Sequence, residues 1–149
     1  MARVILLVES LNNPGNVGAI MRTAEAFAVT RVVLYGNKSF AKGIAKGGHK
    51  WVDLEFAQDP VILDQYRDEG FRITGIENGS GAHSLLTYRF AEDTVLVLGN
   101  EVGGVGKALL SKLDDMVIIP QWGLTGSLNV TQAGSIAIYE YRRQYPYVG

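Results

Sequence analysis

Short apolar runs separated by polar turns recur along the chain and predict buried β-strands. Five of these runs contain four to six residues each and are rich in β-branched side chains, which is typical of strands in the interior of a sheet. A weaker sixth run covers Trp51–Leu54. The five stronger runs are Val4–Val8, Val32–Tyr35, Phe71–Ile76, Val95–Leu98 and Met116–Ile119.

Helical spacing is found between these runs. Apolar residues from Val17 to Ala28 recur every three or four positions and form one stripe along an amphipathic helix. Asp59 and Pro60 mark the start of a second helix, because a capping acid commonly precedes a proline in the first turn. Strands that alternate with helices predict an α/β fold with a mostly parallel sheet and helices on both faces. The predicted helices cover Val17–Ala28, Pro60–Glu69, Lys107–Lys112 and Leu128–Gln144.

The last predicted helix carries apolar residues on almost every side before Glu140. A helix of this kind must be covered on more than one side. Burial within a single chain is one interpretation, and a symmetric homodimer in which a second copy covers the helix is the other. The small residues Ala133, Gly134 and Ser135 allow a close approach by either neighbour.

Composition limits the class of protein. The 149 residues contain no internal repeat or linker, so we expect one domain over residues 1–149. With 47% hydrophobic and 19% charged residues, the composition is that of a globular chain. The absence of cysteine and the presence of only two histidines argue against a metal site. No apolar stretch reaches the roughly 18 residues of a membrane span, and no signal peptide precedes the first strand, so the cytoplasm is the expected location.

Positive charge is unevenly distributed, although the net charge of −1 argues against indiscriminate nucleic-acid binding. Four of the fourteen Lys and Arg residues lie between Asn37 and Lys50, where there is no acid, which leaves ten against fifteen Asp and Glu elsewhere. Their spacing would align them on one face of a helical turn, whereas the neighbouring glycines favour a solvated loop. The four residues are Lys38, Lys42, Lys46 and Lys50.

The first predicted helix opens with Asn16, Gly18 and Arg22. Asn16 is placed to cap this helix, because its side-chain oxygen can accept an unpaired backbone N–H of the first turn. Gly18 and Arg22 lie one turn apart on the face opposite the apolar stripe. A glycine beside a permanent cation suggests a site for a negatively charged molecule, and a fraying first turn with a solvated arginine is the alternative.

Ligands of open parallel sheets bind beyond the carboxyl ends of the strands, and three loops in such positions mix glycine with polar side chains. They follow Val8, Leu98 and Ile119. None of them is a nucleotide-phosphate loop or a nucleophile elbow: Gly48 is followed by His49 rather than Lys-Ser, and the glycines at 104 and 106 lack the third member of the dinucleotide motif. Kinase, dehydrogenase and hydrolase functions therefore lose support.

Taken together, the three loops resemble the signature motifs of the SpoU branch of the SPOUT methyltransferases, in the same order and at suitable separations. The first is Asn16-x-Gly18-x-x-x-Arg22, the second is Leu98-Gly99-Asn100-Glu101-x-Gly103-Gly104, and the third is Ile119-Pro120 followed by Ser127-Leu128-Asn129-Val130.

This resemblance implies ribose 2′-O-methylation of RNA with S-adenosylmethionine, carried out by a homodimer whose C-terminal segment forms a deep trefoil knot around the cofactor. The third motif is closest to that of tRNA-directed members, which include those that modify a D-loop guanosine. Ribosomal RNA is the second candidate substrate, and a catalytically silent RNA-binding member is the alternative to an enzyme. No separate RNA-binding domain is expected.

The resemblance also implies roles for individual residues. Arg22 would hold the phosphate beside the target ribose, or act directly as a base if it lost its proton. The implied catalytic residues are Arg22, Asn16, Glu101, Ser127 and Asn129. The implied cofactor contacts are Gly75, Ile76, Gly99, Ile119, Ser127 and Leu128. RNA contacts fall to Arg22, Lys38, Lys42, Lys46 and Lys50, with Arg142 and Arg143 as weaker candidates.

Several of these residues also have a structural interpretation. Glu101 would be a solvated loop acid, and Ile119 and Leu128 would belong to the core. Ser127 and Asn129 would simply cap the last helix.

Overall fold

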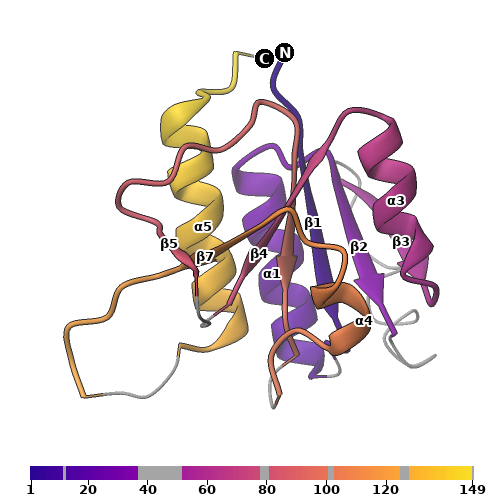
Figure 1. The fold of residues 1–149 in the computed structure, drawn as a ribbon, viewed down its shortest axis with the longest axis horizontal. Helices are drawn as coiled ribbons and strands as arrows, with labels where there is room; N and C mark the ends of the chain where they lie inside the picture. Colours follow the sequence, from indigo (N-terminus) through magenta and orange to yellow (C-terminus); the bar gives the residue numbers. More distant parts are fainter. Residues whose placement is uncertain (12, 37–51, 78–80, 101–102, 125–127, 149) are drawn as a thin grey trace.

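The fold is built on one sheet with helices on both sides (Figure 1). The structure is a computed structural model, and it describes residues 1–11, 13–36, 52–77, 81–100, 103–124 and 128–148. Its strands are β1 (Val4–Glu9), β2 (Arg31–Tyr35), β3 (Asp53–Ala57), β4 (Arg72–Ile76), β5 (His83–Ser84), β6 (Thr94–Leu98) and β7 (Asp115–Ile118). Its helices are α1 (Pro14–Ala26), α3 (Val61–Asp68), α4 (Lys107–Leu110) and α5 (Val130–Gln144).

The strand order is β3-β2-β1-β6-β4-β7-β5, and every pairing between these described strands is parallel. The predicted α/β class and mostly parallel sheet are therefore confirmed. The two-residue strand β5 has no counterpart among the predicted runs, because it is too short for a periodic signal. The weak sixth run lies slightly before β3, which extends to Ala57.

Two apolar cores lie on opposite faces of the sheet because successive strand residues point to opposite sides. Leu6 and Leu96 pack with α1 and α5 on one face. Leu7 and Val97 pack with α3 and α4 on the other. The central strands β1 and β6 are therefore buried on both sides, which explains their continuous apolar sequences.

Helix α1 begins earlier than predicted. Asn13 is its N-cap, with Oδ1 accepting from the backbone N–H of Gly15 at 2.8 Å and of Asn16 at 3.2 Å. Pro14 occupies the first helical position, which suits its fixed φ and missing N–H. The prediction that Asn16 caps the helix is wrong, and Asn16 instead lies within the first turn.

Arg142 is an unexpected part of the core of the fold. It is buried on α5 and donates from Nε to the carbonyl of Phe27 and from a terminal guanidinium nitrogen to that of Ala28, both at 2.8 Å. These carbonyls end α1, so a cation here satisfies acceptors that the helix leaves unpaired. The suggestion that Arg142 contacts RNA is wrong, because this side chain joins the two helices. Arg143 is exposed and pairs with Glu140.

Candidate functional site

A pocket lies at the carboxyl ends of the central strands, where ligands of parallel sheets are expected. Its volume is about 350 Å³, within the range of small-molecule sites. The strands β1, β6, β4 and β7 are consecutive neighbours in the sheet, so the loops that follow them meet at one edge. The three predicted motif loops follow β1, β6 and β7, and the sheet order therefore brings them together.

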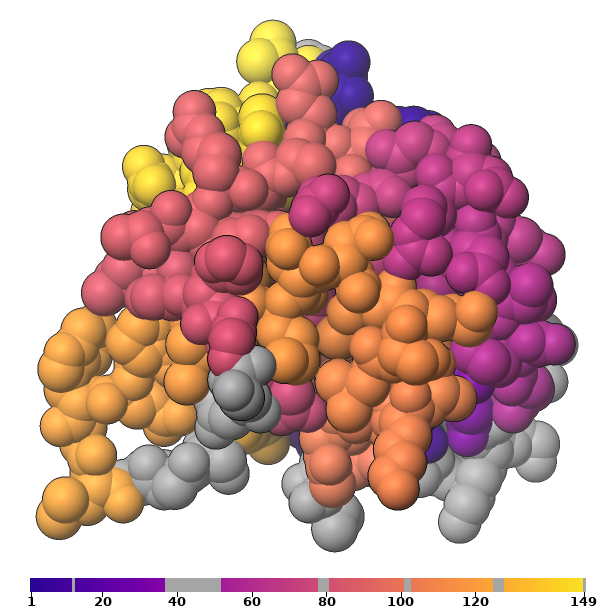
Figure 2. Space-filling model, in the orientation of Figure 1, coloured from indigo at the N-terminus to yellow at the C-terminus, as the bar shows by residue number. Residues whose placement is uncertain are grey.

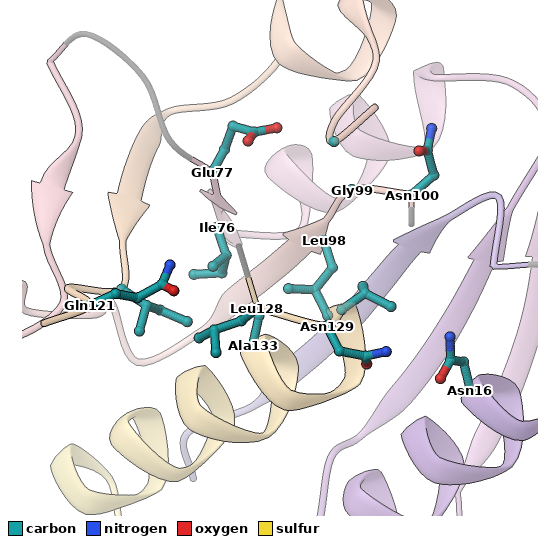
Figure 3. Close-up of a pocket in the computed structure, with 13 residues that line it drawn as sticks. Asn16, Ile76, Glu77, Leu98, Gly99, Asn100, Gln121, Leu128, Asn129 and Ala133 are labelled. Atoms are coloured by element: carbon teal, nitrogen blue, oxygen red, sulfur yellow. The ribbon is translucent and has the colours of Figure 1, made fainter. Parts of the chain in front are cut away.

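Aliphatic side chains form the inner wall of this pocket, and polar groups stand around it. Figure 3 shows Ile76, Leu98 and Leu128 near the centre of the view, with Asn16, Asn100 and Gln121 towards its edges. The complete lining is Asn16, Ile76, Glu77, Leu98, Gly99, Asn100, Gly104, Ile119, Gln121, Leu128, Asn129, Val130 and Ala133.

Six of the predicted site residues line the pocket, and they come from all three motifs and from β4. Glu101, Ser127 and the lysines at 38, 42, 46 and 50 lie outside the described residues. The six that line the pocket are Asn16, Ile76, Gly99, Ile119, Leu128 and Asn129.

Gly75 and Arg22 are absent from the described lining. A Cβ at Gly75 would lie 2.5 Å from Cδ1 of Leu113, so this glycine makes room for a side chain of the α3–α4 core instead. Arg22 is exposed on α1, six residues beyond Asn16, which is roughly 9 Å along the helix axis.

The second-motif loop folds back tightly on itself. The N–H of Asn100 donates to the carbonyl of Gly104 at 3.1 Å, and Oδ1 of Asn100 accepts from the N–H of Gly103 at 2.5 Å. A Cβ on Gly99 would lie 2.2 Å from the carbonyl carbon of Gly104. No side chain fits at Gly99, so two stretches of backbone meet there, and both Gly99 and Gly104 line the pocket.

The third motif ends where α5 begins. Asn129 is the N-cap of α5, and its Oδ1 accepts from the N–H of Thr131 at 2.8 Å. The capping interpretation of Asn129 is thus confirmed, and the same residue also lines the pocket. Its amide therefore lies where a helix start and a ligand site coincide.

Glu77 and Gln121 line the pocket but were not among the predicted site residues. Gln121 directly follows Ile119-Pro120 within the third motif, and this position in the motif is a sequence signal for a site residue. Glu77 directly follows β4, and a polar residue at the carboxyl end of a strand is a sequence signal for a ligand site. Among the described residues there is no group of three or more His, Asp or Glu side chains that could hold a metal ion.

The segment after Gln121 protrudes from the body of the molecule, at the lower left of Figure 2. Its apolar residues Trp122 and Leu124 have exposed fractions of 83% and 105%. Such an apolar tip next to a pocket offers a surface for a large partner molecule.

Comparison with known proteins shows which family has this sequence and fold. The model of the SpoU rRNA Methylase family matches residues 3–139. The chain is 34% identical over 146 residues to the tRNA (guanosine(18)-2′-O)-methyltransferase of Aquifex aeolicus, covering 95% of this chain and 69% of that protein. It is 32% identical over 150 residues to the 23S rRNA (guanosine(2553)-2′-O)-methyltransferase RlmP of Bacillus subtilis, covering 95% of this chain and 58% of that protein.

Solved structures agree with the observed fold. The A. aeolicus TrmH/SpoU tRNA-modifying enzyme has a TM-score of 0.83 at 32% identity, over 97% of this chain and 76% of the other. The AdoMet-bound rRNA methyltransferase of Sinorhizobium meliloti has a TM-score of 0.85 at 25% identity, over 98% of this chain and 57% of the other. Sequence, fold and the meeting of the three motifs agree, and the chain belongs to the SpoU rRNA methylase family.

Proposed function

We propose that this chain transfers a methyl group from S-adenosylmethionine to a ribose 2′-hydroxyl of RNA, with tRNA as the favoured substrate. The observation that carries the proposal is one pocket that gathers residues of all three motifs at the carboxyl edge of the sheet. Among relatives, the A. aeolicus protein is a tRNA guanosine-18 methyltransferase and the B. subtilis protein modifies 23S rRNA. The chain covers 69% of the former protein against 58% of the latter, at similar identity, and this favours tRNA.

The pocket suits the proposed cofactor by its chemistry. The aliphatic walls of Ile76, Leu98 and Leu128 match the faces of an adenine ring, and the backbone groups of Gly99 and Ile119, which also line the pocket, suit its edge. S-adenosylmethionine supplies a methyl group made electrophilic by the sulfonium charge. We assign cofactor contacts to Ile76, Gly99, Ile119 and Leu128, with Ser127 and Gly75 as further predicted contacts.

The residues of the chain must then position the ribose, bind the neighbouring phosphate and allow the hydroxyl proton to leave. Methyl transfer forms a bond from the ribose 2′-oxygen to the methyl carbon, breaks the bond from that carbon to sulfur and releases the hydroxyl proton. A guanidinium stays protonated in ordinary surroundings. We therefore assign Arg22, exposed on α1, to holding the phosphate beside the target ribose, so that this phosphate is in place to help accept the proton. Asn16, Asn129 and the predicted residues Glu101 and Ser127 complete the acceptor side.

The RNA would approach from outside the pocket. Trp122 offers a flat apolar face beside Gln121, and unstacked bases of RNA commonly rest on such faces. The predicted lysines at 38, 42, 46 and 50 would add phosphate contacts. The cytoplasm remains the predicted location, and no helix within the described residues is long and apolar enough to cross a membrane.

A homodimer is part of the proposal. Helices α1 and α5 pack together, with Thr23 Oγ1 and Ser135 Oγ 3.2 Å apart. Ile136 and Tyr139 nevertheless remain 40% and 61% exposed on α5, as expected for a face covered by a second copy. We also keep the predicted trefoil knot. Leu128 and Asn129, just before α5, line the same pocket as Gly99 and Gly104 of the second-motif loop, and this proximity supports it.

Calorimetry and methyl transfer together test the function. We expect S-adenosylmethionine to bind with measurable heat, and label from its methyl group to enter a tRNA transcript. The same transcript with a 2′-deoxy sugar at the modified position should take up no label. A catalytically silent RNA-binding member would give neither heat nor label, and labelling of ribosomal RNA in place of tRNA would assign the alternative substrate.

A further inference from the structure

The carboxylates of Glu77 and Glu9 accept hydrogen bonds from the backbone of the second-motif loop. Glu9 ends β1 and Glu77 follows β4, so the two side chains project from strands on either side of β6. The loop that follows β6 therefore runs between them. Each carboxylate accepts a hydrogen bond from a backbone N–H of that loop, and the two N–H groups belong to consecutive residues, Val105 and Gly106.

Glu77 fits the loop closely. Its Oε2 lies 2.7 Å from the backbone nitrogen of Val105, and a Cβ on Gly104 would lie 2.4 Å from the same oxygen. Gly104 also has φ of +71°, a conformation that favours glycine. The carboxylate therefore fills the space that a side chain at position 104 would need.

Glu9 makes the matching contact one residue further on. Its Oε1 lies 2.6 Å from the backbone nitrogen of Gly106, and a Cβ on Gly106 would lie 2.7 Å from its other oxygen. Hydrogen bonds from a peptide N–H to an ionised carboxylate are stronger than those between neutral groups. Two of them in succession fix the path of the loop.

The two carboxylates differ in their position relative to the pocket. Glu77 and Gly104 both line it, whereas Glu9 and Gly106 are absent from the described lining. Gly104 in turn touches Gly99, where the two backbone stretches meet. A change at Glu77 therefore moves the pocket wall directly, while a change at Glu9 acts at the outer end of the loop.

We propose that Glu77 is a positioning residue for the cofactor: its carboxylate sets Gly104 and thereby the shape of the S-adenosylmethionine pocket, with Glu9 supporting the same loop. This inference rests on the proposed function. Glu77 acts through the loop, and no proton transfer is assigned to it.

The experiment measures S-adenosylmethionine affinity by calorimetry for Glu77→Ala, Glu77→Gln and Glu9→Ala. We expect an affinity loss on the order of tenfold for Glu77→Ala, the size expected when a hydrogen bond to a charged group is lost. Glu77→Gln keeps an acceptor oxygen and should recover part of the affinity, and Glu9→Ala should lose less. Steady-state kinetics should show a raised KM for the cofactor with kcat within about twofold. Glu92→Ala removes an exposed acid elsewhere and is the matched control, with no change expected.

A double-mutant cycle separates this role from general destabilisation. Gly104→Ala places a methyl group against the Glu77 carboxylate, so its effect on cofactor affinity should shrink in a Glu77→Ala background. Additive losses, or an unchanged affinity in folded Glu77→Ala, would overturn the inference. If the unaltered chain itself bound no S-adenosylmethionine, the proposed function would fail first, and the two failures are thus distinguishable.

Discussion

Arg22 is the side chain on which the proposed chemistry depends most, yet it is absent from the described lining of the pocket. It lies exposed on α1, past the first turn that carries Asn16. An arginine so placed can meet RNA without taking part in cofactor binding. RNA contact by Arg22 and cofactor binding in the pocket are therefore separable by mutation.

Replacing Arg22 by alanine should abolish methylation and leave cofactor affinity nearly unchanged. We expect a drop in kcat/KM for RNA of at least about 100-fold, because the phosphate beside the target ribose loses the cation that holds it in place. Calorimetry with S-adenosylmethionine supplies the second measurement. Arg22→Lys keeps the charge without the two-pronged geometry and should retain part of the activity. Loss of cofactor binding in folded Arg22→Ala protein would contradict the assignment.

Arg142 and Arg143 are neighbours with different structural roles. Arg142 joins α5 to the carbonyls of Phe27 and Ala28, and its guanidinium also lies 5.2 Å from the ring centre of Tyr147. Arg142→Ala should lower the free energy of unfolding by roughly 2–4 kcal/mol, since buried carbonyls lose charged donors. Urea denaturation measures this loss. Arg143→Ala removes only an exposed pair with Glu140 and should leave the unfolding midpoint almost unchanged.

At the scale of elements, we expect the close contact between the end of β6 and the second-motif loop to determine the shape of the pocket. Gly99→Ala would put a methyl group about where the Gly104 backbone lies, and backbone cannot move aside as a flexible side chain can. We expect the loop to shift and cofactor affinity to fall by more than tenfold. Gly123→Ala is the control, because a Cβ there meets nothing within 4 Å. Equal affinities for the two variants would show that the close approach does not shape the pocket.

A second element-scale prediction concerns acid stability at the β4–β7 pairing. Asp115 accepts from Arg72 Nε and from the Tyr88 hydroxyl, each at 2.7 Å, and the Arg72 hydrogen bond is the main reason that the pKa of this carboxyl is lowered. A lowered folded-state pKa means that the stabilisation is present above the usual aspartate pKa of 3.8 and is lost as the pH falls below it.

Asp115→Asn should therefore reduce stability by about 1–2 kcal/mol at pH 7 and make stability fall less steeply between pH 5 and 3. Urea midpoints over this pH range provide the measurement. Asp68→Asn, an exposed acid on α3, is the comparison variant. An unchanged slope in Asp115→Asn would contradict the assigned role of the ion pair.

At the scale of the whole molecule, the exposed apolar face of α5 tests the proposed dimer. Ile136→Glu places a charge on this face without disturbing the buried side of the helix, and we expect a monomer in sedimentation experiments. Val61→Glu on α3 changes a similarly exposed apolar residue, 43% against 40%, on the opposite face of the sheet. It should leave the dimer intact. A dimer that persists in Ile136→Glu would remove α5 from the interface.

Local patterns in the sequence determined the elements of this protein. The runs that became β1, β6 and β7 and the stripe on α1 are recognisable because burial imposes a short period on neighbouring residues. The three motifs were likewise visible as residues close together in the chain. The cap of α1 shows the limit of local patterns, because Asn13 and Asn16 both precede the apolar stripe. Asn13 is the N-cap, with Pro14 directly after it at the first helical position.

Only the tertiary structure decided which distant groups meet. The sheet order places β6 between β1 and β4, and this order brings Glu9 and Glu77 beneath a loop far away in sequence. The packing of α5 against α1 places Arg142 at the end of α1, while Arg143 is exposed to solvent. Sequence periodicity reports burial along one element, whereas contacts between elements depend on strand order and register, which arise from packing the whole chain.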